Sequence, residues 1–243
     1  MFGEGEEGVR LNKYVAHCGI ASRRKAGDLI VQGLVKVNGE VVREIGHRVQ
    51  RGDVVQFKGK TIEPETQKVY ILLNKPKNTV TTVSDDRGRT TVMDIIGDAV
   101  QERIYPVGRL DRATTGLLLL TNDGTLARKL SHPSEGVTKF YHVVLDQPVK
   151  QSHIRQIADG LMLEDGKAIV DKVDYVKDSD QMEVGVEIHM GKNRIVRRLF
   201  EHFGYQVKKL DRTYYAGLTK KDLPRGRFRH LTEREVIMLK HFT

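Results

Sequence analysis

Apolar residues recur at helical spacing at the start of the chain. In RLNKYVAHC they fall at positions i, i+3, i+4 and i+7 from Leu11, which predicts a helix over 10–18. Ser22 is a favourable N-cap for a second helix over 23–32, and Gly33 ends that helix. The chain therefore begins with two short helices separated by a tight turn.

Alternating apolar positions follow these helices. In LVKVNGEVV the pair Asn38-Gly39 lies between alternating valines, which predicts a β-hairpin, and a further short strand is predicted over 53–57. These elements form one small domain over 9–62. The polar, proline-containing segment 63–68 is interpreted as a linker.

The rest of the chain, 69–243, is predicted to be one domain in which β-rich runs dominate and helices are interspersed. The run VYILLNKPKNTVTTV is read as two strands broken at Asn74-Lys75-Pro76, and Asp123 is a good cap for a short helix. Further strands are predicted over 104–108, 116–122, 139–145 and 182–190, and further helices over 152–161 and 193–204. Because no strict strand–helix–strand rhythm appears, we expect an α+β fold with a largely antiparallel sheet.

Positive charge is concentrated in two blocks of the chain. The formal net charge is +9; residues 9–60 hold 11 lysines and arginines against four acidic residues, and residues 191–230 hold 12 against three. Such concentration favours a polyanionic partner, most simply nucleic acid, over an evenly solvated basic surface.

Composition narrows the possible chemistry. A single cysteine leaves no internal disulfide, which fits a reducing cytoplasm, and the apolar runs are too short to span a membrane. The acidic, glycine-rich segment 1–8 is expected to be a flexible tail and not a signal peptide. The dispersed histidines and the lack of phosphate-binding glycine loops predict neither a metal nor a cofactor.

Five basic residues of the first domain lie on its two predicted helices. Arg10 and Lys13 are one turn apart on the first helix, and Arg23, Arg24 and Lys25 form the first turn of the second. Cations there oppose the helix dipole, and a bound phosphate would relieve that conflict. The alternative is that these side chains simply extend into water.

The segment RLNKYVAHCGIASRRKAGDLIVQGLVKVNG resembles the S4 RNA-binding domain. The resemblance covers the two helices, the Ser-Arg-Arg turn and the Gly-x-Val-x-Val-Asn-Gly hairpin. It implies that the small domain binds structured RNA, but it names no reaction.

A lone carboxylate stands out in VGRLDRATTGLLLLTNDG, over 107–124. Asp111 has Arg109 and Arg112 as neighbours and a leucine run after it. The simpler interpretation is a surface ion pair, with Arg109 on the same face of an extended segment and Arg112 pointing away. The alternative is a reactive carboxylate that an arginine keeps ionised and nucleophilic.

The same stretch resembles the catalytic motif of pseudouridine synthases of the RsuA/RluB type, which modify ribosomal RNA. Four other segments resemble further motifs of that family, so that the similarity runs from about residue 9 to about residue 238: LNKPKNTVTT, LSHPSEGVTKFYHV, GKNRIVRRLFEHFGYQVKKLDR and LPRGRFRHLTEREV. The resemblance implies isomerisation of uridine without a cofactor, on a base flipped out of its stack.

The resemblance also implies residue roles. Asp111 matches the aspartate that attacks the uridine, Tyr141 the tyrosine that packs against the uracil, and Arg197 the arginine that pairs with the aspartate. Arg109 would then brace the loop or contact RNA. We expect further RNA backbone contacts from the remaining basic residues near these motifs: Arg112, Lys192, Arg194 and Arg198.

Two positions depart from the family pattern. Ala113 stands where the family usually has Asp or Asn, and Ile195 stands where Gln is common. Neither removes a reacting group, so the expected reaction is unchanged.

The expected protein is a monomeric enzyme that acts on ribosomal RNA or a ribosomal assembly intermediate and does not bind a membrane. Large-subunit rRNA is the favoured target, and small-subunit rRNA is the alternative. A non-catalytic RNA-binding assembly factor with the same fold is the second hypothesis.

Overall fold

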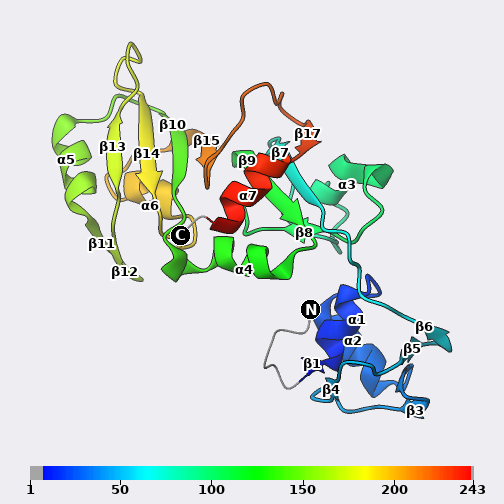
Figure 1. Ribbon diagram of the computed structural model, residues 1–243. Helices are drawn as coiled ribbons and strands as arrows, with labels where there is room; N and C mark the ends of the chain where they lie inside the picture. The colour runs from blue at the N-terminus through cyan, green and yellow to red at the C-terminus, as the bar shows by residue number, and fades with distance from the viewer. Residues whose placement is uncertain (1–7, 242–243) are drawn as a thin grey trace. The chain divides into compact units, whose positions relative to one another are not determined.

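The computed structural model describes residues 8–241, which form two compact units, Met1–Lys68 and Val69–Thr243 (Figure 1). Except for Gly8, the expected tail at 1–8 lies outside the described residues. Between residues 8 and 241, no helix is long and apolar enough to cross a membrane.

The first unit packs two helices against small sheets. Its helices are α1 (Leu11–His17) and α2 (Arg23–Val31). One sheet has the order β3-β2-β5-β6 and a second pairs β1 with β4, with these bounds: β1 Val9–Arg10, β2 Val35–Val37, β3 Glu40–Val41, β4 Arg48–Val49, β5 Val55–Phe57 and β6 Lys60–Thr61. The predicted helices and hairpin are therefore confirmed.

Local signals explain why these elements form. The Ser22 hydroxyl accepts a 3.3 Å hydrogen bond from the Lys25 backbone N–H, as expected of an N-cap. Asn38 and Gly39 have φ of 52° and 86°, the two successive positive values that a tight type I′ hairpin turn requires. Ile62 belongs to the core of this unit, and the Glu65 N–H donates to the His17 carbonyl oxygen at 2.9 Å.

The second unit is built on a nine-stranded sheet whose central path is β13-β14-β10-β15-β9-β7-β17, with β8 beside β9 and β16 beside β15. Its pairings are antiparallel except that of β9 with β15, so the expected largely antiparallel sheet is confirmed. The strands are β7 Tyr70–Lys75, β8 Tyr105–Pro106, β9 Thr115–Thr121, β10 Lys139–Leu145, β13 Lys172–Tyr175, β14 Glu183–Ile188, β15 Val207–Tyr215, β16 Leu218–Thr219 and β17 Phe228–His230.

Five helices and one separate hairpin complete this unit. The helices are α3 Val92–Ile96, α4 Gly124–Ser131, α5 Gln151–Asp159, α6 Ile195–Glu201 and α7 Glu233–His241, and the hairpin joins β11 Leu161–Leu163 to β12 Gly166–Ala168. Asp123 caps α4 by accepting hydrogen bonds from the N–H groups of Thr125 and Leu126, which confirms that prediction.

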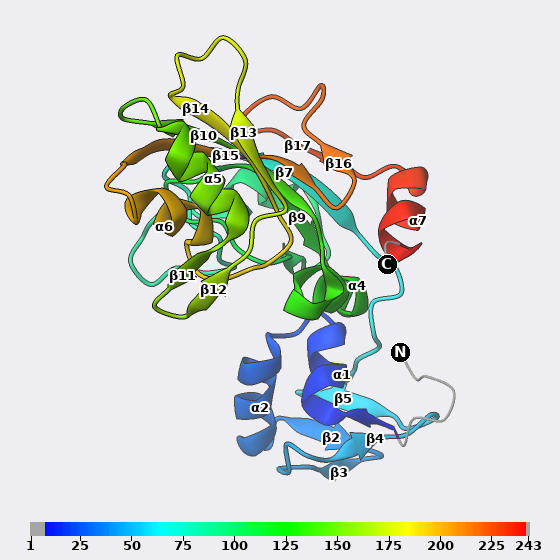
Figure 2. The same ribbon diagram turned by 90° about the vertical axis from the view of Figure 1, so that its left-hand side faces the viewer.

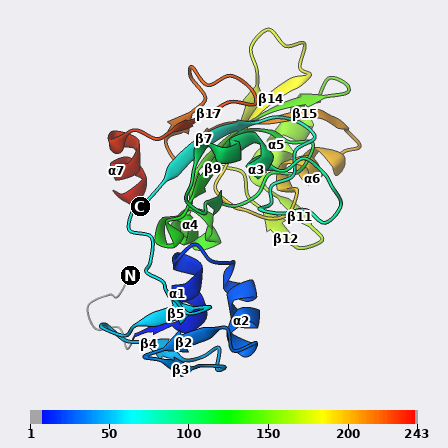
Figure 3. The same ribbon diagram turned by 90° about the vertical axis from the view of Figure 1, so that its right-hand side faces the viewer.

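Side-chain alternation along β7 shows that the sheet is covered on both faces. Tyr70 and Leu72 pack in one core cluster with residues of α4 and α7, whereas Ile71 and Leu73 pack in another with residues of α3. Figures 2 and 3 show α7 on the opposite side of the sheet from α5 and α6. Burial on both faces explains why β7 and β9 are almost continuously apolar.

A third core cluster lies under α5 and α6, against β10, β14 and β15. Tyr141, on β10, packs against this cluster and also against the cluster that contains α3. It therefore lies where the two cores on that face of the sheet meet.

One predicted strand is absent. The run after Pro76 contributes only an isolated bridge between Val80 and Thr91, so the reading of two strands in this segment was wrong. The backbone N–H of Asn78 bonds instead to the Arg112 carbonyl oxygen at 2.9 Å, and the Thr81 hydroxyl donates to the Leu110 carbonyl oxygen at 2.8 Å. These residues support a loop and do not extend the sheet.

Candidate active site

Asp111 lies in the loop that joins β8 to β9. A turn after it is closed by the Thr114 N–H, which donates to the Asp111 carbonyl oxygen at 3.0 Å. The Asp111 side chain is 37% exposed, so that it is held by protein but remains accessible. The sheet begins only at Thr115, so Asp111 lies in a loop with a turn at 112–113.

Two arginines from a distant part of the sequence face Asp111. Arg194 Nη1 lies 3.6 Å and Arg197 Nε lies 3.9 Å from the same carboxylate oxygen, Oδ2. Arg109 and Arg112 are exposed, and neither takes part in an ion pair among the residues described. The simple surface pair between Asp111 and its sequence neighbour is therefore not what the structure shows.

Arg197 is mostly buried, with 9% of its side chain exposed. Its Nη1 donates a 3.0 Å hydrogen bond to the Val207 carbonyl oxygen on β15, while its buried Nε has no hydrogen-bond partner. Burial, and then the nearby Arg194, lower the pKa of Arg197, whereas Asp111 opposes that shift. A guanidinium remains protonated after such a shift, so a positive charge lies beside Asp111.

Lys75, at the end of β7, supports the Asp111 loop from below. Its side chain is completely buried and donates hydrogen bonds to the carbonyl oxygens of Thr114 at 2.7 Å and Pro76 at 3.0 Å. Burial lowers the pKa of Lys75 to about 8, although the Asp111 carboxylate acts in the opposite direction. The sequence around Lys75 does not indicate this role, because the burial of Lys75 under the loop depends on tertiary structure.

Tyr141 is half-buried on β10, opposite Val186 on β14 and Arg212 on β15. In the described part of the chain its hydroxyl has no hydrogen-bond partner, and no hydrogen bond joins it to Asp111. The structure thus places Asp111 and Arg197 within ion-pair distance of each other, and Tyr141 lies on β10.

The parallel pairing of β9 with β15 lies directly after the Asp111 loop. Thr115 donates from its hydroxyl to the Asp211 carboxylate at 2.7 Å, and the buried Arg212 donates from Nε to the Leu117 carbonyl oxygen at 2.8 Å. Gly116 is opposite Arg212 in this register. We refer to this pairing of Thr115–Thr121 with Val207–Tyr215 as the seam of the sheet.

Asp211 also fastens the segment after β15. It forms ion pairs with Lys220 and with Arg225, the latter at 2.7 Å. Burial alone would raise the pKa of Asp211, but hydrogen bonds from Arg225, Lys220 and Thr115 outweigh it and hold that pKa at about 2. The local sequence indicates no such role for Asp211 or Arg212, because their partners lie on distant segments.

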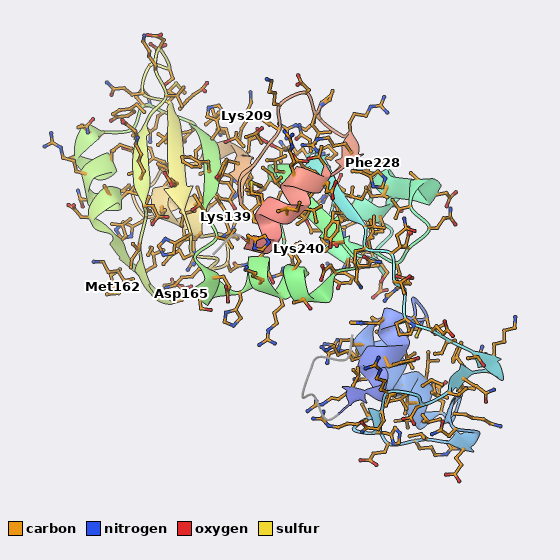
Figure 4. The ribbon with its side chains drawn as sticks, in the orientation of Figure 1. Lys139, Met162, Asp165, Lys209, Phe228 and Lys240 are labelled. Atoms are coloured by element: carbon orange, nitrogen blue, oxygen red, sulfur yellow. The ribbon has the colours of Figure 1, made fainter. Side chains whose placement is uncertain are left out.

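Two of the predicted RNA contacts, Lys192 and Arg198, are bound to one carboxylate. Asp165, labelled in Figure 4, lies at the turn of the β11–β12 hairpin. It accepts two hydrogen bonds from Arg198, at 2.9 and 3.0 Å. Lys192 donates to the Asp165 carbonyl oxygen at 2.7 Å. Lys192 and Arg198 thus connect the start of α6 to the hairpin.

The basic residues of the first unit remain available to a ligand. Arg10, Arg23, Arg24 and Lys25 are exposed, Lys13 is half-exposed, and none of them has an ion pair among residues 8–241. Burial, followed by the positive charges of Lys68, Lys13 and Arg23, lowers the pKa of His17 to about 4. The surroundings of α1 and the start of α2 are therefore electropositive.

Ala113 is exposed, and Ile195 is buried in the core under α6. Within the described ranges, no group of three or more His, Cys, Asp or Glu side chains could hold a metal ion. The site is thus one accessible carboxylate, two arginines and a neighbouring tyrosine.

Comparison with known proteins gives two family matches. Residues 69–202 match the model of the RNA pseudouridylate synthases, and residues 9–55 match that of the S4 domain.

Similar proteins extend over nearly the whole chain. The ribosomal large subunit pseudouridine synthase B of Bacillus subtilis is 43% identical over 95% of this chain and 95% of its own length. The dual-specificity RNA pseudouridine synthase RluF of Escherichia coli K12 is 38% identical over 96% of this chain and 79% of its own. A crystal structure of a pseudouridylate synthase, 29% identical, superimposes with a TM-score of 0.68 over 95% of this chain and 99% of that one.

Proposed function

We propose that this chain, which belongs to the RNA pseudouridylate synthase family and is a pseudouridine synthase, isomerises a uridine of large-subunit ribosomal RNA. The target is supported by similarity over nearly the full length to a relative named for that subunit. Small-subunit rRNA has no such support. A non-catalytic assembly factor would have no need of an accessible carboxylate with two arginines beside it.

The observation that carries the proposal is the placement of two guanidinium groups beside the accessible Asp111 carboxylate. Arg194 Nη1 lies 3.6 Å and Arg197 Nε lies 3.9 Å from Asp111 Oδ2, and the Asp111 side chain is 37% exposed. A carboxylate that is positioned by cations and is accessible can act as a nucleophile on the ribose or on the base.

The reaction needs only a few groups. The N1–C1′ bond of uridine breaks, the uracil turns, and a C5–C1′ bond forms; C5 loses a proton and N1 gains one. No electrons leave the nucleoside, so neither an oxidant nor a group donor is required. Asp111 would serve as nucleophile and Arg197 as its charge partner.

Tyr141 is proposed to pack against the flipped uracil. It is half-buried where two core clusters meet, and its hydroxyl has no hydrogen-bond partner in residues 8–241. A ring with one side packed by core and one side open can stack on a base. Its hydroxyl is available to hydrogen-bond with the uracil.

RNA binding is proposed to involve both units. In the S4 domain the exposed cations on α1 and α2 would contact phosphates, and in the catalytic unit the unpaired Arg109 and Arg112 would do so beside Asp111. Lys192 and Arg198 could contribute only while also bound to Asp165. We propose that the enzyme acts as a cytoplasmic monomer on rRNA or an assembly intermediate.

The test is replacement of Asp111 by Asn, which keeps the shape of the side chain but removes its charge. Pseudouridines in rRNA are mapped from cells that carry the wild-type or the variant protein, and RNA affinity is measured on the purified proteins. We expect one pseudouridine in large-subunit rRNA to disappear while affinity stays within about threefold. Normal modification by the Asp111→Asn variant would refute the assignment. The exposed Asp98→Asn is the matched control.

A further inference from the structure

We propose that Arg194 is a positioning residue, which together with Arg197 holds the Asp111 carboxylate by its Oδ2 atom while Glu201 holds Arg194 in place. This inference rests on the proposed role of Asp111 as nucleophile. It gives Arg194 a function that differs from the RNA contact expected from the sequence.

The three side chains form a chain of ion pairs. Arg194 Nη2 donates to Glu201 Oε1 at 3.0 Å, and Arg194 Nη1 lies 3.6 Å from Asp111 Oδ2. Glu201 is the last residue of α6 and Arg194 is its N-cap, so the pair spans the length of this helix. The guanidinium is thereby oriented by one carboxylate toward another.

The backbone of Arg194 supports a specialised position. Its φ and ψ are 48° and 28°, a left-handed conformation that costs an arginine about 1 kcal/mol or more and is uncommon without a compensating contact. The next turn of helix then brings Arg197 toward the same carboxylate. Lys192 and Arg198 fasten this turn to Asp165 from both sides. The turn is therefore built so that both guanidinium groups reach one atom.

Arg197 is not the only cation beside the Asp111 carboxylate. Its Nε lies 3.9 Å from Oδ2, and that buried N–H has no hydrogen-bond partner. Arg194 approaches the same oxygen more closely, with Nη1 at 3.6 Å. Both guanidinium groups therefore attract the carboxylate at Oδ2 by charge.

Lys75, on β7, is the other charged group near Asp111. The Asp111 carboxylate raises the pKa of Lys75, but burial of Lys75 lowers that pKa by more. The charges that face Asp111 are thus Arg194 and Arg197 from the α6 region and Lys75 from the strand beneath. Arg194 is the most exposed of the three, with 43% of its side chain accessible. It can be replaced with the least disturbance to the core.

The experiment measures single-turnover pseudouridine formation over a range of RNA concentrations for the full-length wild type, Arg194→Gln and Arg194→Lys, which separates the maximal rate from RNA affinity. In Arg194→Gln the Asp111 carboxylate loses one of the two guanidinium groups that orient it. The maximal rate should fall about tenfold, with RNA affinity changed less than about threefold. Arg194→Lys should restore most of the rate, and Arg155→Gln, an exposed arginine of α5, should leave both the rate and the affinity unchanged.

Glu201→Gln provides the second arm. If Glu201 acts through Arg194, it should slow the reaction, and the double variant should be no slower than Arg194→Gln alone. An unchanged maximal rate combined with a large loss of RNA affinity would make Arg194 an RNA contact and overturn the proposal, as would additive effects in the double variant. Failure of the proposed function would look different, because the wild type would then form no pseudouridine at all.

Discussion

The buried ammonium group of Lys75 donates a 2.7 Å hydrogen bond to the carbonyl oxygen of Thr114, three residues beyond Asp111. The same nitrogen donates to the carbonyl oxygen of Pro76. One side chain from β7 therefore ties the end of its own strand to the loop that carries the proposed nucleophile. The position of Asp111 thus depends on a residue that does not touch the substrate.

Replacing Lys75 by Met is expected to loosen this loop and slow the reaction. Met has a similar unbranched stem but cannot donate to the two carbonyl oxygens, which costs about 2 kcal/mol in unfolding free energy. A reactive group displaced by about 1 Å loses roughly 100-fold in rate. Single-turnover kinetics test this, with the exposed Lys77→Met as control. An unchanged rate would show that the loop holds its shape without Lys75.

The stability difference between wild type and Lys75→Met should also depend on pH. The pKa of Lys75 is about 8 in the folded protein, below the value near 10.4 expected for an unfolded chain. Between these values the unfolded state binds more protons, so the wild type gains stability as pH rises, and the variant lacks that gain. Urea unfolding should show the gap widening by roughly 2 kcal/mol from pH 7 to 9.5. A constant gap would contradict the lowered pKa assigned to the buried Lys75.

Replacing Gly116 by Ala should separate the seam between β9 and β15. Gly116 has a φ of 107°, and a Cβ there would lie 2.8 Å from the carbonyl carbon of Arg212 and closer still to that residue's nitrogen and oxygen. The strands must move apart, at a cost of about 3 kcal/mol or more in unfolding free energy. Thermal or urea unfolding measures the loss. Gly136→Ala is the control, because its φ of 58° is also positive but the space around it is open, so that it should lose only about 1 kcal/mol.

Replacing Asp211 by Asn should remove a pH-dependent contribution to the unfolding free energy. The folded-state pKa of Asp211, about 2, is below the unfolded value near 3.9, so its contribution is complete above the unfolded value and is lost as pH falls toward 2. We expect Asp211→Asn to lose about 2 kcal/mol at pH 7 and progressively less below pH 4. Unfolding of both proteins in urea at pH 7 and at pH 2.5 tests this. Equal losses at the two pH values would rule out the proposed ionic contribution.

Replacing Arg23 and Arg24 together by Ala should weaken RNA binding by the S4 domain. Both side chains are exposed in the first turn of α2, which is capped by Ser22 and not by these residues, so the fold should survive. If each arginine contacts a phosphate, the slope of log affinity against log salt should fall by about 2. Filter binding at several salt concentrations measures the slope. The exposed pair Arg51→Ala with Lys60→Ala is the control, and equal slopes for wild type and the Arg23/Arg24 variant would place the RNA elsewhere.

Features that depend on neighbouring residues were predictable from the sequence. The cap at Ser22, the turn at Asn38-Gly39 and the cap at Asp123 each depend on a side chain and backbone only a few positions away. The prediction of a strand after Pro76 was wrong because residues of this segment form hydrogen bonds with another loop. This tertiary effect outweighs the local preference for β-structure.

The site was predictable only in part, for a related reason. Resemblance to a family directed attention to Asp111 and Arg197, and the structure places them within 3.9 Å. Arg194 was expected to face RNA, because nothing in its local sequence shows the left-handed turn that directs it to Asp111. The roles of Lys75 and Asp211 could not be predicted, because their burial and their partners depend on the pairing of strands that are far apart in the sequence.

The active site of the catalytic unit is complete only when the seam has formed. Asp111 enters from the β9 side of the seam, whereas Tyr141 and Arg197 belong to the side formed by β10, β15 and α6. Neither side contains a complete set of reacting groups, and residues from both sides, such as Leu117 and Tyr215, share one apolar cluster. The groups proposed to react therefore come together only when β9 and β15 pair.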